Sequence, residues 1–147
     1  MAKIDITVVT GAAEQALQDM QNQIELQVER AMMAIALEAE AKAKASIMRG
    51  PKTGRIYKKY NPKRTHQASA PGEAPANDLG FLVGSIRAEP TPGEPFKVTL
   101  AAKADYAIHL EYGTRNMAAR PFLKPAGDAM KGRGEEILSA FLRKVQP

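Results

Sequence analysis

The sequence contains no cysteine and no tryptophan, and its aromatic residues are limited to four tyrosines and four phenylalanines. Without cysteine, neither a disulfide framework nor a thiolate metal site can form. The two histidines are too few to build a histidine-based metal site on their own. Because aromatic residues make up only 5% of the chain, we expect an aliphatic, alanine-rich core.

Long hydrophobic runs are also missing. No stretch approaches the ~20 apolar residues that a membrane span needs. The chain begins Met-Ala-Lys-Ile-Asp, which carries no apolar secretion core. We therefore expect a soluble intracellular protein. A length of 147 residues suggests a single domain, 1–147, which can bury roughly 68% of the surface that its unfolded chain exposes.

Acidic residues are absent from Ala41 to Gly72, although the whole chain has a net charge of only +5. Nine cations fall in this window: Lys42, Lys44, Arg49, Lys52, Arg55, Lys58, Lys59, Lys63 and Arg64. A tract of this kind favours an anionic partner, which could be a phosphate backbone or an acidic protein surface.

The N-terminal third predicts a short strand followed by a long helix. Ile4, Ile6 and Val8 alternate with polar residues, and Thr10 is suited to cap a helix that follows. From Ala12 to Met48 there is neither glycine nor proline, and apolar residues recur every three or four positions. The alternative is two helices separated by a kink.

A helix over 12–48 would be roughly 55 Å long, which exceeds what a domain of this size can cover. We expect part of it, at the alanine-rich end Ala31–Ala45, to meet a neighbouring subunit or to stand clear of the body. Gly50 and Pro51 then end the helix.

The segment Lys52–Gly80 predicts a long irregular loop that carries most of the basic tract. It contains several prolines and small polar residues, and it closes with turn chemistry at Asn77–Gly80. A loop of this length inside a small domain is more often functional or disordered than a simple connection.

Order is expected to resume at Phe81. Leu82, Ser85 and Ile86 fit one turn of helix that leads into a strand, and Pro90–Gly93 forms a turn. Phe96–Leu100 alternates as a second strand, which predicts an antiparallel hairpin.

The stretch Asp105–Ala126 is the densest in aromatic and turn-forming residues. Its first part, 106–112, alternates like a strand, but Asp105 and Gly113 also fit the cap and the stop of a two-turn helix, which we favour. Pro121 and Pro125 suit the first turn of a C-terminal helix that runs to Val145, weakened by three glycines. The order of elements predicts an α+β fold, with a long N-terminal and a C-terminal helix packed on a small antiparallel sheet.

Catalytic patterns were sought and not found. The chain has no phosphate loop, no Rossmann glycine pattern and no nucleophile elbow. His109 and Glu111 share a face only on a strand, so we interpret His109 as a partly buried histidine and Asp105 as a cap. Carboxylates do not cluster enough for a two-metal site, so we expect no enzyme activity, no metal and no cofactor.

The strongest candidate site is the basic tract, represented by Arg55, Lys58, Lys59, Lys63 and Arg64. With Tyr57 and Tyr60 interleaved, these cations could follow a phosphate backbone and stack on it. Two other interpretations remain open: a solvated loop, or a loop that becomes ordered against an acidic neighbour in an assembly.

Three ordered motifs carry a family resemblance. The first is 51–54, PKTG; the second is 70–80, APGEAPANDLG, followed by Leu82 and Ser85-Ile86; the third joins YA at 106–107, LEYGT at 110–114 and MAARPFL at 117–123, with Pro125-Ala126. In this order and spacing they resemble the small neck proteins of long-tailed bacteriophages, over about Ile4 to Ala126. The basic segment between Gly54 and Ala70 is longer here than in that family's pattern.

The resemblance implies a tail-completion or head–tail joining protein of the virion, made in the host cytoplasm. Such proteins are structural and non-enzymatic, and they form a ring, usually sixfold, through which DNA passes. Their partners are copies of themselves and adjacent neck and tail-tube proteins. Where the protein lines the channel, the DNA that passes through is a further partner. Tail completion, terminator and stopper rings remain alternatives, as does a stand-alone nucleic-acid-binding protein. The motif residues carried over are Tyr106, Glu111, Gly113, Pro121 and Phe122.

Overall fold

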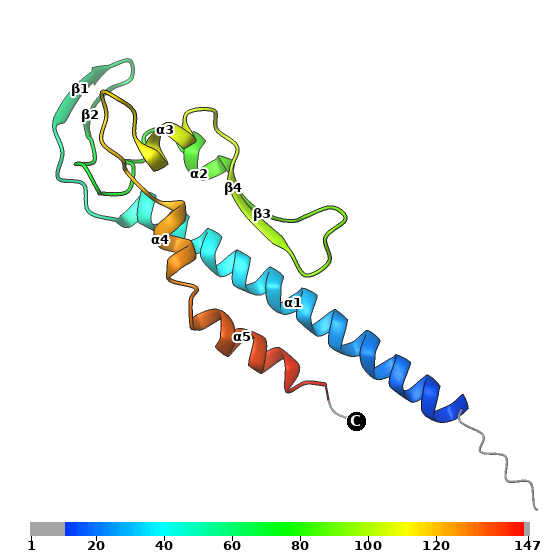
Figure 1. The fold of residues 1–147 in the computed structure, drawn as a ribbon. Coiled ribbons are helices and arrows are strands. Elements are labelled where there is room, and N and C mark those ends of the chain that lie inside the picture. The colour runs from blue at the N-terminus through cyan, green and yellow to red at the C-terminus, as the bar shows by residue number, and fades with distance from the viewer. Residues whose placement is uncertain (1–10, 146–147) are drawn as a thin grey trace, which may run out of the picture.

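In this computed structural model, residues 11–145 are described. The predicted α+β class is confirmed: a long helix crosses the molecule, and two small antiparallel sheets and four shorter helices are arranged along it (Figure 1). The strand predicted at Ile4–Val8 and the cap at Thr10 lie outside the described residues.

The elements follow one another in a simple order. They are α1 (Gly11–Arg49), β1 (Ile56–Tyr60), β2 (Lys63–Gln67), α2 (Phe81–Ser85), β3 (Ile86–Pro90), β4 (Val98–Ala102), α3 (Ala107–Tyr112), α4 (Leu123–Asp128) and α5 (Arg133–Leu142). The strands form two separate hairpins, β1–β2 and β3–β4. In the second hairpin Ile86 faces Ala102 and Pro90 faces Val98, which confirms the antiparallel pairing expected there.

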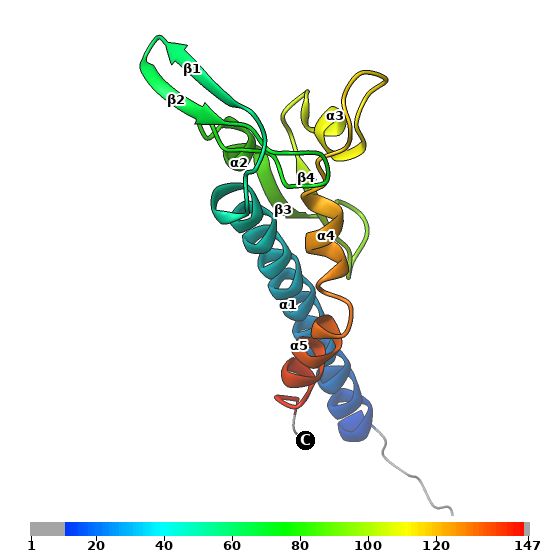
Figure 2. The same ribbon diagram turned by 90° about the vertical axis from the view of Figure 1, so that its left-hand side faces the viewer.

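Helix α1 is continuous over 39 residues, so the single-helix prediction is confirmed over the kinked alternative. The expectation about its alanine-rich end is wrong. Ala31, Ala36, Ala39 and Ala43 are buried in the chain's own core, because small side chains let β3, β4 and α4 approach the helix closely. The opposite half, 11–30, is mostly exposed, and its beginning extends beyond the body (Figures 1 and 2).

The core gathers around the C-terminal half of α1. Its members come from α1, α2, β3, α3 and α4: Ala43, Ile47, Leu82, Ile86, Ala107, Phe122 and Ala126. Phe122, Ile47 and Ile86 are its largest fully buried side chains. Glu40 adds a polar link, because its carboxylate accepts the backbone N–H of Ala88 at 2.7 Å and so fastens β3 to α1.

Three local predictions need correction. The segment 52–80 is not one irregular loop, since 56–67 forms the β1–β2 hairpin around a cis Asn61–Pro62 peptide bond. The second strand of the other hairpin begins at Val98 and not at Phe96, which has a positive φ of 65°. The C-terminal helix is divided into α4 and α5, because Gly132 adopts a φ of 79° between them.

The helical prediction for 106–112 is confirmed by α3. Asp105 does not cap it, since the helix starts after Tyr106 without a side-chain capping bond. His109 is exposed and not partly buried, because on a helix it points away from the face that carries the buried Glu111. The two short C-terminal helices complete the body, with both α4 and α5 packed along α1.

Candidate partner-binding surface

The β1–β2 hairpin has two chemically different faces. Directly opposed residues of an antiparallel pair share a face, and successive residues alternate. The pairing of Tyr57 with His66 and of Lys59 with Arg64 places these four side chains on the face toward the body. The other face carries Ile56, Lys58, Tyr60, Lys63, Thr65 and Gln67, all of which are exposed.

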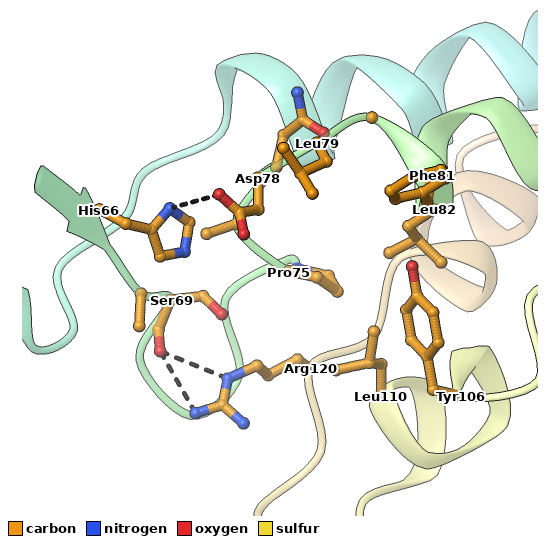
Figure 3. Close-up of a pocket in the computed structure, with 14 residues that line it drawn as sticks. His66, Ser69, Pro75, Asp78, Leu79, Phe81, Leu82, Tyr106, Leu110 and Arg120 are labelled. Carbon is orange, nitrogen blue, oxygen red and sulfur yellow. Dashed lines mark hydrogen bonds and ion pairs between the residues drawn. The ribbon is translucent and has the colours of Figure 1, made fainter. Parts of the chain in front are cut away.

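The inward cations converge on one carboxylate, Asp78. Lys59 and Arg64 each form an ion pair with it, and Arg64 Nη1 also donates to the Asp78 backbone oxygen at 3.3 Å. His66 Nδ1 lies 3.8 Å from Asp78 Oδ1 (Figure 3). These three contacts hold the hairpin against the 76–80 turn, so two of the five predicted partner-binding cations are used inside the chain.

The same contacts determine the protonation of Asp78. Its pKa is lowered, first because Lys59 donates a hydrogen bond to the carboxylate, and further because Arg64, Lys59 and His66 lie close; partial burial opposes the shift. The carboxylate therefore remains charged well into the acid range, which keeps the hairpin attached over the ordinary pH range.

The positive charges on the outward face of the hairpin are not neutralised by acidic side chains of residues 11–145. Lys58 and Lys63 form no ion pair within residues 11–145, and Tyr60, which faces Lys63 across the turn, is 80% exposed. Ile56 on the same face is 62% exposed. Arg55 lies just before β1, with its guanidinium 5.5 Å from the ring centre of Tyr57. This surface combines positive charge with exposed aromatic and aliphatic groups, a composition typical of a binding surface.

The base of the hairpin is closed by Glu73. Its carboxylate accepts the backbone N–H and the hydroxyl of Thr53, at 2.9 and 2.6 Å, and the backbone N–H of Ala70 at 2.8 Å. These bonds lower the pKa of Glu73, the Thr53 hydroxyl most of all. Gly54 pairs with Ala68 so closely that a Cβ would lie 2.6 Å from the Ala68 oxygen. Residues of the first and second motifs therefore meet at this point.

The third motif builds the joint between α3 and α4. Glu111 is buried, and its carboxylate accepts three successive backbone N–H groups: those of Phe122 and Leu123 at 2.8 and 3.0 Å, and that of Lys124 at 2.7 Å. These are the first amides of α4, which have no partner within the helix. A negative charge at this position also suits the helix dipole. Glu111 thus caps a helix that begins 12 residues after it.

Gly113 and Pro121 direct the chain around this cap. Gly113 has φ 77° and ψ −179°, a conformation that only glycine adopts readily. A Cβ there would lie 2.7 Å from the Met117 oxygen and 2.8 Å from the Ala119 nitrogen. Pro121 precedes the buried Phe122, and the neighbouring Arg120 donates to the Ser69 oxygen at 3.3 Å, which connects this joint to the end of the hairpin.

A pocket of about 310 Å³ lies between the hairpin and α3 (Figure 3). Two of its charged or titratable side chains are engaged: His66 lies beside Asp78, and Arg120 donates to the backbone oxygen of Ser69. Tyr106, which is 46% exposed, directs its hydroxyl toward Leu82 across the pocket. Within residues 11–145 no group of three histidine, aspartate or glutamate side chains is arranged to hold a metal ion. The pocket is best described as a gap between neighbouring structural elements.

A second exposed surface is the protruding half of α1. Leu17 is 67% exposed, Met20 46% and Leu26 44%, although the same helix is buried further along. From Gly11 to Glu29 the sequence has four acidic residues and no basic one. Asp19 and Glu25 receive only the side-chain amides of Gln15 and Gln21, each at 2.9 Å, among the contacts formed by residues 11–145.

The structure divides the predicted site residues into two groups. Lys58 and Lys63 face outward, whereas Lys59 and Arg64 bind Asp78 and Arg55 lies over the ring of Tyr57. Sequence reasoning missed Asp78 and His66 as members of this site. The Asn61-Pro62 turn signal between two β-prone runs would have indicated the hairpin, and the hairpin would have indicated which cations share a face.

No protein-family model, no curated protein sequence and no solved structure matches this chain. Among the helices of residues 11–145, none has both the length and the apolar character that crossing a bilayer requires.

Proposed function

We propose that this chain is a structural, non-enzymatic virion protein that forms a homo-oligomeric ring in the neck of a long-tailed bacteriophage. The ring joins the head connector to the tail, as a tail-completion protein does. One observation carries this proposal best: the N-terminal half of a 39-residue helix is mostly exposed, including the apolar side chains of Leu17, Met20 and Leu26. Such a helix is suited to an assembly in which a neighbour covers it.

The use of the motif residues supports the same function. Glu73, Glu111, Gly113 and Phe122 are engaged in capping, tight turns and core packing, so the residues behind the resemblance serve the scaffold. A rigid body with two exposed extensions is suited to a geometric task. Repeated copies would present one side to the head and the other to the tail, with heterologous contacts around the axis.

Cryo-electron microscopy of the parent particle's neck tests the proposal. We expect this chain in a closed ring between connector and tail tube, sixfold by the resemblance. Its level along the axis distinguishes a completion ring from a terminator or stopper ring. Cells infected with a phage mutant that lacks the gene should accumulate separate heads and tails. Absence of the chain from purified virions would overturn the proposal.

A second candidate function is nucleic-acid binding by the hairpin, and Tyr60 favours it. An 80% exposed tyrosine beside Lys63 and Lys58 resembles a stacking platform next to phosphate-binding cations. Binding of this kind should weaken with salt with a slope of about −0.9 per phosphate contact. It should be lost in Lys58→Ala/Lys63→Ala, and a slope near zero would exclude it.

A further inference from the structure

The two exposed extensions of the molecule lie at opposite ends. The β1–β2 hairpin lies beyond the C-terminal end of α1, and the protruding half of α1 points away from it (Figures 1 and 2). One end is purely basic between Ala41 and Gly72, and the other is purely acidic between Gly11 and Glu29. A single copy cannot bring these ends together, because a continuous helix holds them apart.

We propose that the outward face of the hairpin of one copy docks on the protruding half of α1 of the next copy. The inference deepens the proposed ring and rests on it, since a heterologous contact of this kind is what closes a ring. The hairpin face consists of Ile56, Lys58, Tyr60 and Lys63, and the helix face consists of Asp19, Leu26 and Glu29, which share one side of α1 because they lie seven and three positions apart.

Charge complementarity identifies the occupant. Within residues 11–145 neither Lys58 nor Lys63 forms an ion pair with a carboxylate, and neither Asp19 nor Glu29 forms one with a cation. Pairing the two faces joins opposite charges at both ends of the contact. Pairing two protruding helices would instead bring acidic side chains together, so a helix–helix dimer through this half is disfavoured.

The apolar groups on the two faces also correspond. Tyr60 and Ile56 are the most exposed large hydrophobic side chains of the hairpin, and Leu26 on the helix face is 44% exposed. The dimensions agree too: a five-residue strand spans about 17 Å, and the helix from Asp19 to Glu29 spans about 15 Å.

The inward cations explain why the hairpin can serve as a preformed arm. Lys59 and Arg64 hold it to Asp78, and Glu73 closes its base, so its outward face is fixed before a neighbour arrives. A preorganised surface loses less conformational freedom on binding. The basic tract is thus divided between cations that position the arm and cations that contact the neighbour.

A charge-swap experiment tests the contact with the full chain. Sedimentation velocity should show wild-type oligomers, and both Lys58→Glu/Lys63→Glu and Asp19→Lys/Glu29→Lys should shift the chain to monomers. An equimolar mixture of the two variants should assemble again, because alternating copies then pair opposite charges at every contact. All four substitutions in one chain should also restore self-assembly.

A matched control reverses two exposed cations outside both faces, Arg115→Glu/Lys131→Glu, with the same change in net charge as Lys58→Glu/Lys63→Glu. It should assemble like the wild type, and far-ultraviolet circular dichroism should show that each variant retains its helix content.

If both reversed variants form the same oligomers as the wild type, the proposed contact is overturned and the neck ring still stands. A wild-type chain that stays monomeric, or a mixture that fails to reassemble, would also overturn it. If the reversed hairpin loses only DNA affinity, the hairpin faces DNA and the contact is refuted.

Discussion

The α3–α4 joint and the β1–β2 hairpin are each organised by one carboxylate, but the two carboxylates have different partners. Glu111 is buried and binds three backbone amides of α4, whereas Asp78 is partly exposed and binds the side chains of Lys59, Arg64 and His66. When a buried carboxylate that accepts backbone N–H groups is removed, solvent water does not replace it as the acceptor. A partly exposed one that binds flexible cations competes with water and salt.

The difference indicates separate roles for the two regions. The joint maintains the fold, because removing its carboxylate leaves donors unsatisfied beside the fully buried Phe122. The hairpin holds a surface in place, because its contacts orient an arm that buries little of its own area. Substitutions at the joint should therefore change stability, and substitutions in the hairpin should change assembly.

The largest effect is expected for Glu111→Ala. Three backbone amides lose their acceptor, and an unsatisfied buried donor costs about 1–3 kcal/mol, so we expect a loss of about 3–4 kcal/mol after partial hydration of the gap. Urea denaturation followed by circular dichroism measures it. Glu111→Gln keeps one acceptor oxygen and should fall between the alanine variant and the wild type. An alanine variant as stable as the wild type would remove Glu111 from the scaffold.

Gly113→Val should come next. Valine at a φ of 77° is strained, and its Cβ would lie 2.7 Å from the Met117 oxygen. Backbone strain of this kind costs about 1–3 kcal/mol. The melting temperature should fall, whereas Gly127→Ala, a helical glycine with open space around it, should leave it unchanged or raise it. Equal melting temperatures for Gly113→Val and the wild type would contradict the backbone conformation described here.

A smaller and pH-dependent effect is expected for Asp78→Asn. Because the folded pKa of Asp78 is lowered, its contribution to stability is present above the unfolded value of about 3.9 and is lost as pH falls through the folded pKa. The variant should therefore be less stable than the wild type near pH 7, and the two should converge in strong acid. Thermal melts from neutral to acid pH test this, and a gap that widens in acid would contradict the sign.

The smallest effect on folding is expected for single substitutions that compare the two faces of the hairpin. Lys58→Ala should change the free energy of unfolding by no more than about 0.5 kcal/mol, as for most surface substitutions. Lys59→Ala, the adjacent residue, removes an Asp78 partner and should speed amide hydrogen exchange in β1 and β2. Identical exchange in the two variants would show that the faces are not distinct.

Much of the fold could be predicted from local patterns. Helix α1, helix α3 and the β3–β4 hairpin follow from apolar periodicity and from the glycines and prolines that end each segment. The β1–β2 hairpin could not be predicted from apolar alternation, because 56–60 is rich in charged residues and because a proline-containing segment is typical of a loop. The division of the C-terminal helix was missed because a glycine only weakens a helix unless its φ is positive, as at Gly132.

The sequence predicted which residues belong to the candidate site but not how they are arranged. The five cations Arg55, Lys58, Lys59, Lys63 and Arg64 belong to it, but strand pairing decides which of them bind Asp78, and Asp78 lies 14 residues beyond the last of them. The sequence marks Glu111 only as a motif residue two positions after His109. Its partners are backbone amides, which leave no signature in a sequence.

By itself the sequence determined the elements that depend on neighbouring residues: a long amphipathic helix, a basic tract without acids and turns at glycine and proline. Only the tertiary structure decided which half of α1 is buried, which cations remain free and where Glu111 and Asp78 act. The physical reason is that burial and ion pairing depend on contacts between distant segments. The packing of Ala31–Ala43 against β3, β4 and α4 leaves the leucine- and glutamate-bearing half of α1 for a neighbour.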